Sequence, residues 1–259
     1  MKRALSVFPP LFGLTLVISL WWLAVHWLKV PNYLLPDPVN VVRTLYAGFI
    51  EGRFWGHLFF TAQSTLIGYF VGCSLAVVFG SLMAESPLFG RIVYPLVISL
   101  QSMPKVALAP LIIVWFGFGI ESKIVMVALI CFFPVFINTA MGLQHAKPEL
   151  LDLMKAFSAS RADIFFQIKL PSAAGHIFAG LQIAVVLSLI GAVVAEFVSS
   201  TKGIGYLINA AAVDLATDVM FAGLITLAAM GLLGSLLIRF LHGKLIFWDR
   251  GSADTAGSV

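Results

Sequence analysis

Six long apolar runs constrain the fold of this chain more than any other feature of its sequence. They cover residues 4–28, 58–84, 92–120, 124–144, 170–195 and 219–238, and the third is interrupted by Lys105. Each run holds roughly the 20 apolar residues that an α-helix needs to cross about 30 Å of hydrocarbon. The sequence therefore predicts an all-α membrane protein with six transmembrane helices.

The composition supports this prediction. The chain of 259 residues is 60% hydrophobic and 11% charged, whereas a soluble domain is typically about 25% charged. The net charge of +4 does not indicate nucleic-acid binding, because the basic residues lie at the ends of the apolar runs. Cys73 and Cys131 lie inside apolar runs, which favours core packing. The five histidines are scattered along the sequence. The cysteines and histidines therefore predict neither a disulfide framework nor a metal site.

Counts of lysine and arginine predict the orientation in the membrane. With the N-terminus in the cytoplasm, ten basic residues fall on the inner side and five on the outer side. The positive-inside rule favours this arrangement. Six spans then place both termini in the cytoplasm, together with residues 145–171. The first apolar run is longer than the core of a signal peptide, so we interpret it as an anchored span. We expect a single membrane domain at 1–248 and a disordered polar tail at 249–259.

Residues 145–171 form the longest polar interruption in the second half of the chain, and they predict a pair of short helices. Pro148 suits the first turn of a helix, where its missing N–H costs nothing. Apolar residues then recur at helical spacing as far as Phe157. We expect the first helix to break at Ser158–Ala159.

The second helix of this pair has a recognisable start. Ser160 and Asp163 match a capping box, in which each side chain accepts a backbone N–H of the other residue. Leu170–Pro171 is expected to close the helix. Short helices with apolar faces outside the bilayer need a binding partner, so this segment is a candidate interaction site.

Residues 101–110 interrupt the third apolar run. Pro104 and Pro110 each remove a backbone donor, which is tolerated inside a membrane only where protein or a water-filled cavity satisfies the freed carbonyls. A charge on Lys105 at this depth costs at least about 2.5–3.5 kcal/mol. One interpretation is a broken span whose Lys105 extends to the outer interface. The other is a pathway lined by Gln101, Ser102 and Lys105, in which the lysine attracts anions.

Two further polar residues interrupt apolar runs. Asn138, close to Pro134, either lines a path or packs against a neighbouring helix. Glu196 lies near the outer end of the fifth run, where it either lines a path or lies at the membrane interface. The sequence contains no phosphate-binding loop, no metalloprotease motif and no catalytic triad pattern. We therefore expect no enzymatic activity from this chain.

Residues 145–171 resemble the cytoplasmic signature of the permease subunits of ATP-binding-cassette (ABC) importers. That signature is Glu-Ala-Ala, three residues, Gly, nine residues and Ile-x-Leu-Pro. Its opening falls on Asp152-Leu153-Met154, its glycine on Ser158, and its ending on Ile168, Leu170 and Pro171. The spacing matches throughout, but only the first opening position is acidic and a serine replaces the glycine. If the turn requires a positive φ, this serine costs about 1–2 kcal/mol.

Other segments resemble the nitrate/sulfonate/taurine-type branch of the same family. They are Leu34–Pro38, Leu108–Leu111, Trp115–Gly117, Ser122–Ile124, Ala195–Glu196, Lys202–Tyr206, Ala216–Asp218 and Ala222–Gly223. The resemblance implies the transmembrane domain of a type I ABC importer, with a cytoplasmic coupling helix, in the inner membrane of a bacterium. It implies a pathway for a small solute, either a nitrate-, sulfonate- or taurine-like anion or a molecule like a small vitamin precursor.

The resemblance also implies partners. A second copy of the permease forms the pathway with this chain, two ATPase subunits receive the short cytoplasmic helices, and a periplasmic binding protein delivers the solute. ATP and Mg²⁺ are used by the ATPase, so the permease itself is expected to bind no cofactor and no metal. The residues assigned to ATPase coupling are Asp152, Leu153, Ala156, Phe157, Ser158, Ser160, Arg161, Phe165, Ile168, Leu170 and Pro171. The docking face within this set is Leu153, Ala156, Phe157 and Arg161.

The pathway residues suggested by the sequence are Gln101, Ser102, Pro104, Lys105, Asn138 and Glu196. Family members often have a second proline after Pro104, where this chain has Lys105, so we hypothesise that Lys105 attracts an anionic substrate. An ion-coupled secondary transporter is the alternative, but that class often shows intramembrane acids and matching broken helices. Glu196 is the one candidate acid here, and the break at 101–110 has no second copy in the sequence. A membrane-embedded enzyme would need clustered catalytic residues, which the sequence lacks.

Overall fold

A computed structural model describes residues 2–246 of the protein, and this part of the chain is helical without strands. The helices are α1 (Lys2–Trp27), α2 (Pro38–Ile50), α3 (Arg53–Glu85), α4 (Pro87–Ser102), α5 (Ala109–Phe116), α6 (Ile120–Gln144), α7 (Pro148–Ala156), α8 (Arg161–Ile164), α9 (Leu170–Ser199), α10 (Ile204–Val213) and α11 (Thr217–Leu245). Two short segments complete them: the 3₁₀ turn η1 (Lys105–Leu108) and the π-helical turn η2 (Phe165–Lys169). The all-α prediction is confirmed. The expected tail at 249–259 lies outside the described residues.

Within the described residues, four helical segments are long and apolar enough to cross a membrane: α3, α6, the continuous segment Arg161–Ser199, and α11. The pair formed by α4 and Lys105–Phe116 counts as a fifth apolar unit, bent by 90° at its break. The first predicted span lies in α1, a helix of 26 residues, but the apolar helical segment described there, Thr15–Trp27, is shorter than a span. The count of six spans therefore stays a prediction.

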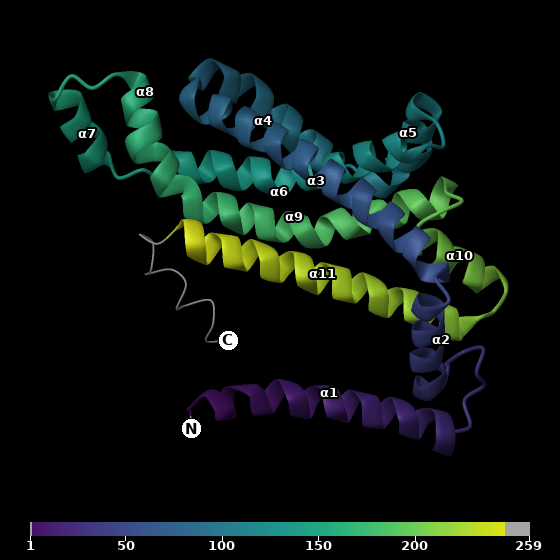
Figure 1. The fold of residues 1–259 in the computed structure, drawn as a ribbon. Coiled ribbons are helices and arrows are strands. Elements are labelled where there is room, and N and C mark those ends of the chain that lie inside the picture. The colour runs from purple at the N-terminus through teal and green to yellow at the C-terminus, as the bar shows by residue number, and fades with distance from the viewer. Residues whose placement is uncertain (1, 247–259) are drawn as a thin grey trace. The chain divides into compact units, whose positions relative to one another are not determined.

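The chain divides into two compact units, and one of them comprises Thr61–Ser200 and Ala229–Val259. In this unit α6 and α9 pack along each other (Figure 1). Their side chains join those of α3 in a core that includes Cys73 and Cys131, both buried free thiols as expected. Gly72 lets α3 approach α6 closely, since a methyl group on it would lie 2.5 Å from the Ala128 carbonyl oxygen. This contact is the close helix packing that small residues permit in lipid.

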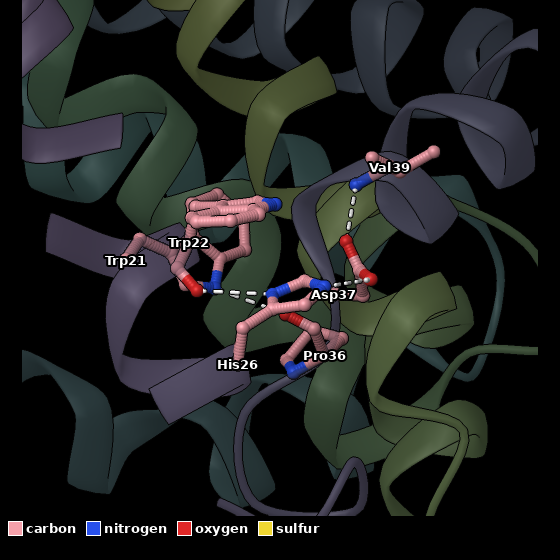
Figure 2. A network of polar contacts seen from close by, with 6 residues as sticks. All are labelled: Trp21, Trp22, His26, Pro36, Asp37 and Val39. Carbon is pink, nitrogen blue, oxygen red and sulfur yellow. Dashed lines mark hydrogen bonds and ion pairs between the residues drawn. The ribbon is translucent and has the colours of Figure 1, made fainter. Parts of the chain in front are cut away.

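The other unit comprises Met1–Phe60 and Thr201–Ala228. Its corner between α1 and α2 is shown in Figure 2. Asp37 caps α2 as its sequence predicts, by accepting the Val39 N–H at 2.8 Å. The indole N–H of Trp21 donates to the Pro36 carbonyl at 3.0 Å, and the His26 ring lies 3.7 Å from Asp37. Side chains of α1 therefore hold the loop that leads into α2.

Candidate functional site

The α7 helix and its turn form the first part of the predicted interaction segment. Pro148 begins α7, as expected. After the last residue of α7, the Ser158 N–H donates to the Lys155 carbonyl and the Ala159 N–H donates to the Met154 carbonyl. This pair of bonds is a Schellman motif, which requires a left-handed residue directly after the C-cap. Ser158 is that residue, with φ of +55°.

The start of α8 confirms the predicted capping box. The Asp163 N–H donates to Ser160 Oγ at 3.2 Å, and the Ser160 N–H donates to the Asp163 carboxylate at 3.2 Å. Two backbone donors that the first helical turn leaves free are therefore satisfied by side chains. The chain between α7 and α8 is a defined turn with hydrogen bonds on both sides.

The predicted end of the second helix at Leu170–Pro171 is wrong. The helix continues through η2 into α9, so Arg161–Ser199 is one helical segment of 39 residues. In η2 the Leu170 N–H donates to the Phe165 carbonyl, five residues back. This wider turn directly precedes Pro171, which stands in the first turn of α9. Proline is compatible with that position because its missing N–H breaks no bond of the new helix.

The assigned coupling residues divide into an exposed and a half-buried group. Phe157, the C-cap residue of α7, is 76% exposed, and Leu153, one helical turn earlier, is 53% exposed. The other exposed members are Asp152, Ala156, Ser158, Ser160 and Arg161, and the half-buried ones are Phe165, Ile168, Leu170 and Pro171. We use the term coupling surface for Leu153, Ala156, Phe157 and Arg161. The sequence assignment missed Phe166, which is 65% exposed on η2, because nothing in the sequence signals the π-helical turn.

A long-range ion pair connects this segment to the membrane helices. The Lys169 ammonium lies 2.6 Å from the Glu85 carboxylate, with the Lys169 side chain 20% exposed and the Glu85 side chain 34% exposed. Glu85 ends α3 and Lys169 ends η2. By contrast, the pair of Lys155 and Asp152 on α7 is well exposed. In Figure 1, α7 and α8 lie beyond the ends of α6 and α9. The ion pair therefore links η2, which connects α8 to α9, to the end of α3.

The break in the third apolar run is sharper than the sequence indicates. Met103 is extended, with φ of −74° and ψ of 139°, because the Pro104 ring disfavours a helical conformation for the residue before it. The axis turns by 90° there. The Lys105 ammonium lies 4.8 Å from the centre of the Phe133 ring and donates to the Gln101 carbonyl at 3.3 Å. Lys105 therefore folds back over the break.

The remaining pathway candidates lie in different surroundings. Gln101, Ser102 and Pro104 are exposed beside Lys105. Asn138 donates to the Pro134 carbonyl at 2.7 Å and packs against Gly180 of α9, which fits the packing interpretation. Glu196 is 1% exposed and accepts a hydrogen bond from Thr61 at 2.7 Å, so it is a core residue of its unit. The structure thus brings four of the six candidates together at the break.

Lys123 is a polar core residue that the sequence assignment missed. It is one of the five basic residues that the sequence places on the outer side, yet it is fully buried. Its ammonium donates to the carbonyls of Ser199 at 2.6 Å and Phe118 at 2.9 Å. A lysine in the first turns of a helix is disfavoured by the helix dipole, and that was the available signal. It lies near the carboxylate of Glu196, so α6 and the end of α9 share a buried polar cluster.

Comparison with known proteins identifies the family. The model of the family described as "Binding-protein-dependent transport system inner membrane component" matches residues 76–246, more than half of the chain. The chain belongs to this family. It is therefore a multi-pass inner-membrane permease component of an ABC importer, and ATP hydrolysis is the task of a separate subunit. The matched region includes the helix break at Pro104, the coupling surface, and the buried residues Lys123 and Glu196.

Individual relatives are similar along nearly their whole length. The permease is 31% identical to the formylaminopyrimidine transport permease protein ThiX of Halalkalibacterium halodurans, over 96% of this chain and 99% of the relative. It is 32% identical to the putative aliphatic sulfonates transport permease protein SsuC of Bacillus subtilis, over 90% and 84%. Among solved structures, a chain of the inward-facing MetNI methionine ABC transporter gives a TM-score of 0.64 at 19% identity, over 76% of this chain and 97% of that one. This likeness confirms the type I importer fold.

Proposed function

We propose that two copies of this permease form the pathway of an ATP-driven importer, with an ATPase subunit bound at each coupling surface. A periplasmic binding protein delivers the substrate at the opposite end. Both termini face the cytoplasm, as the excess of basic residues at the ends of the spans supports. ATP and Mg²⁺ act in the ATPase, so the permease contributes the pathway and the mechanical connection.

The observation that carries this proposal is the exposed apolar face of α7 on a rigid turn. Leu153 and Phe157 are largely exposed, although the segment around them is polar. The Schellman motif and the capping box fix α7 relative to α8, and α8 continues into α9. A rigid connection transmits a displacement that a flexible loop would absorb. Closure of the ATPase dimer would therefore move α9.

The test of the coupling surface is the Phe157→Ala variant of the full transporter. A buried aromatic anchor at an interface is typically worth more than about 2 kcal/mol, so we expect at least a tenfold weaker co-purification of the ATPase. Phe240→Ala is the matched control, because Phe240 is a similarly exposed phenylalanine (65%) that belongs to α11 and not to the coupling surface. If Phe157→Ala binds the ATPase as tightly as the wild type, the coupling surface is wrongly assigned.

We propose a small anion, of the nitrate-, sulfonate- or taurine-like class, as substrate. Lys105 supports this, because it places a positive charge at the bent break of the third apolar run. The similarity to a sulfonate permease is consistent with it. Lys105→Gln should raise the KM for anion uptake while ATPase binding remains intact. Unchanged uptake kinetics in this variant would remove the proposed role of Lys105.

A neutral molecule like a small vitamin precursor is the second candidate. The ammonium of Lys105 already contacts a backbone carbonyl and the Phe133 ring, so part of its charge is satisfied within the protein. The similarity to ThiX covers almost all of that relative. Uptake of both substrate classes by proteoliposomes that contain the complete transporter separates the candidates. A neutral substrate predicts uptake that does not depend on the charge at residue 105.

A further inference from the structure

A cavity of about 580 Å³ lies between α3, α4 and α6, away from the break and from the coupling surface. Its walls come from the last turn of α3, the first half of α4 and the last two turns of α6. All three helix segments belong to the same compact unit. The cavity therefore opens at the end of the spans from which α7 and α8 extend.

The lining of this cavity has two chemical zones. Its wall is mostly apolar, with Met83, Phe136, Ile137 and Met141 among the lining side chains. The polar side chains are Arg91, Tyr94 and Gln144, and no carboxylate lines the cavity. A ligand that fits this lining has a long apolar part and an anionic end.

Arg91 supplies the positive charge of the cavity and has capacity for a ligand. Within residues 2–246, the Arg91 side chain forms no ion pair, and its guanidinium donates no hydrogen bond. The nearby carboxylate of Glu85 is paired with Lys169. An arginine in this state can bind a phosphate group through two parallel N–H bonds.

The depth of each group matches that of a lipid molecule. Arg91 lies four residues into α4, about 6 Å from its start, whereas Phe136 lies eight residues above Gln144, about 12 Å along α6. The charge is therefore near the water boundary and the apolar wall extends into the hydrocarbon. Basic pockets between transmembrane helices at the cytoplasmic side suit lipid head groups.

We propose that this cavity binds an anionic phospholipid, with its phosphate at Arg91 and one acyl chain along the α6 wall. A small free anion would leave the apolar wall without a partner, whereas a neutral lipid would leave Arg91 without a counter-charge. The site is separate from the transport pathway proposed above. Its test therefore does not depend on the identity of the substrate.

The experiment measures lipid binding by the purified full-length permease in detergent, by native mass spectrometry and by the shift of its thermal unfolding. Dioleoyl-phosphatidylglycerol is compared with dioleoyl-phosphatidylcholine and with glycerol phosphate. We expect binding and a raised unfolding temperature with phosphatidylglycerol alone. Arg91→Gln should weaken this binding by about fivefold, the factor expected for one basic residue at a lipid head group. Arg91→Lys keeps the charge, so its affinity for phosphatidylglycerol should lie between those of the wild type and of Arg91→Gln.

Arg239→Gln is the matched control, since Arg239 is an exposed arginine of α11 that does not line the cavity. This variant should bind phosphatidylglycerol like the wild type. Equal binding of the two phospholipids, or an equal loss in both arginine variants, would overturn the proposal. Binding of glycerol phosphate that depends on Arg91 would also overturn it, because the cavity would then be a site for free anions.

Discussion

At the residue scale, Ser158 occupies a backbone conformation that favours glycine. Its φ of +55° is imposed by the Schellman motif at the end of α7. A side chain in this region costs about 1–2 kcal/mol relative to glycine. We therefore expect Ser158→Gly to raise the free energy of unfolding by about 1 kcal/mol and to preserve transport, as measured by thermal unfolding in detergent and by uptake.

Ala156→Gly is the control for this substitution. Ala156 is the last residue of α7, where a glycine gains nothing from its conformational freedom and costs up to about 1 kcal/mol. The two glycine variants should thus shift the unfolding temperature in opposite directions. A marked loss of uptake in Ser158→Gly would show that the serine hydroxyl has a function beyond the turn.

Lys123 is the second residue with a clear consequence. Its side chain is fully buried, and its ammonium donates to the carbonyls of Phe118 and Ser199. Lys123→Met should destabilise the protein by about 3 kcal/mol, because it removes two hydrogen bonds and the positive charge near the buried carboxylate of Glu196. Lys244→Met, at an exposed lysine of α11, should cost less than about 1 kcal/mol. Equal unfolding temperatures of the two variants would contradict the importance of this cluster.

At the scale of elements, the ion pair of Glu85 and Lys169 connects α3 to η2. A double-mutant cycle with Glu85→Gln and Lys169→Gln should give a coupling energy of about 1 kcal/mol, because the pair is close and less exposed to solvent than an ordinary surface pair. The exposed pair of Asp152 and Lys155 provides the comparison and should give at most about 0.5 kcal/mol. Coupling no larger than that of the exposed pair would mean that the link between α3 and η2 is weak.

Elements with local sequence signals were predicted well. The caps at Asp37 and Ser160 and the start of α7 at Pro148 depend on residues within four positions of each other. The buried role of Lys123 depends on Ser199, 76 residues away, and that of Glu196 on Thr61, 135 residues away. Such long-range partners leave no periodic pattern in a sequence. The helix end at Pro171 was wrongly predicted for a different reason, since proline both closes helices and begins them.

At the scale of the whole molecule, the orientation in the membrane is open to a direct test. Because Cys73 and Cys131 are buried, single cysteines can be introduced without removing them. We expect a membrane-impermeant maleimide to label Thr201→Cys in intact cells that have a permeabilised outer membrane. Lys147→Cys should be labelled only after the inner membrane is opened, although both positions are exposed in the fold. The reverse pattern would invert the proposed topology.

The transporter class has its own test at this scale. Proteoliposomes that contain the permease, its ATPase and the binding protein should accumulate substrate only with ATP. Proteoliposomes with the permease alone should show no accumulation when an ion gradient is applied. Accumulation by the permease alone would favour the competing class of ion-coupled secondary transporters.

The π-helical turn η2 also affects how the helix phase is set. A residue in an α-helix advances the helix by about 100°, and a π-helical turn accommodates one extra residue within a single turn. Because η2 takes up one extra residue, the faces of α8 and α9 keep the alignment that they would have in a regular α-helix with one residue fewer. The segment Arg161–Ser199 is about 58 Å long, so a rotation introduced at α8 is carried along the whole length of α9. The extra residue of η2 thus fixes the angular offset between the faces of α8 and α9.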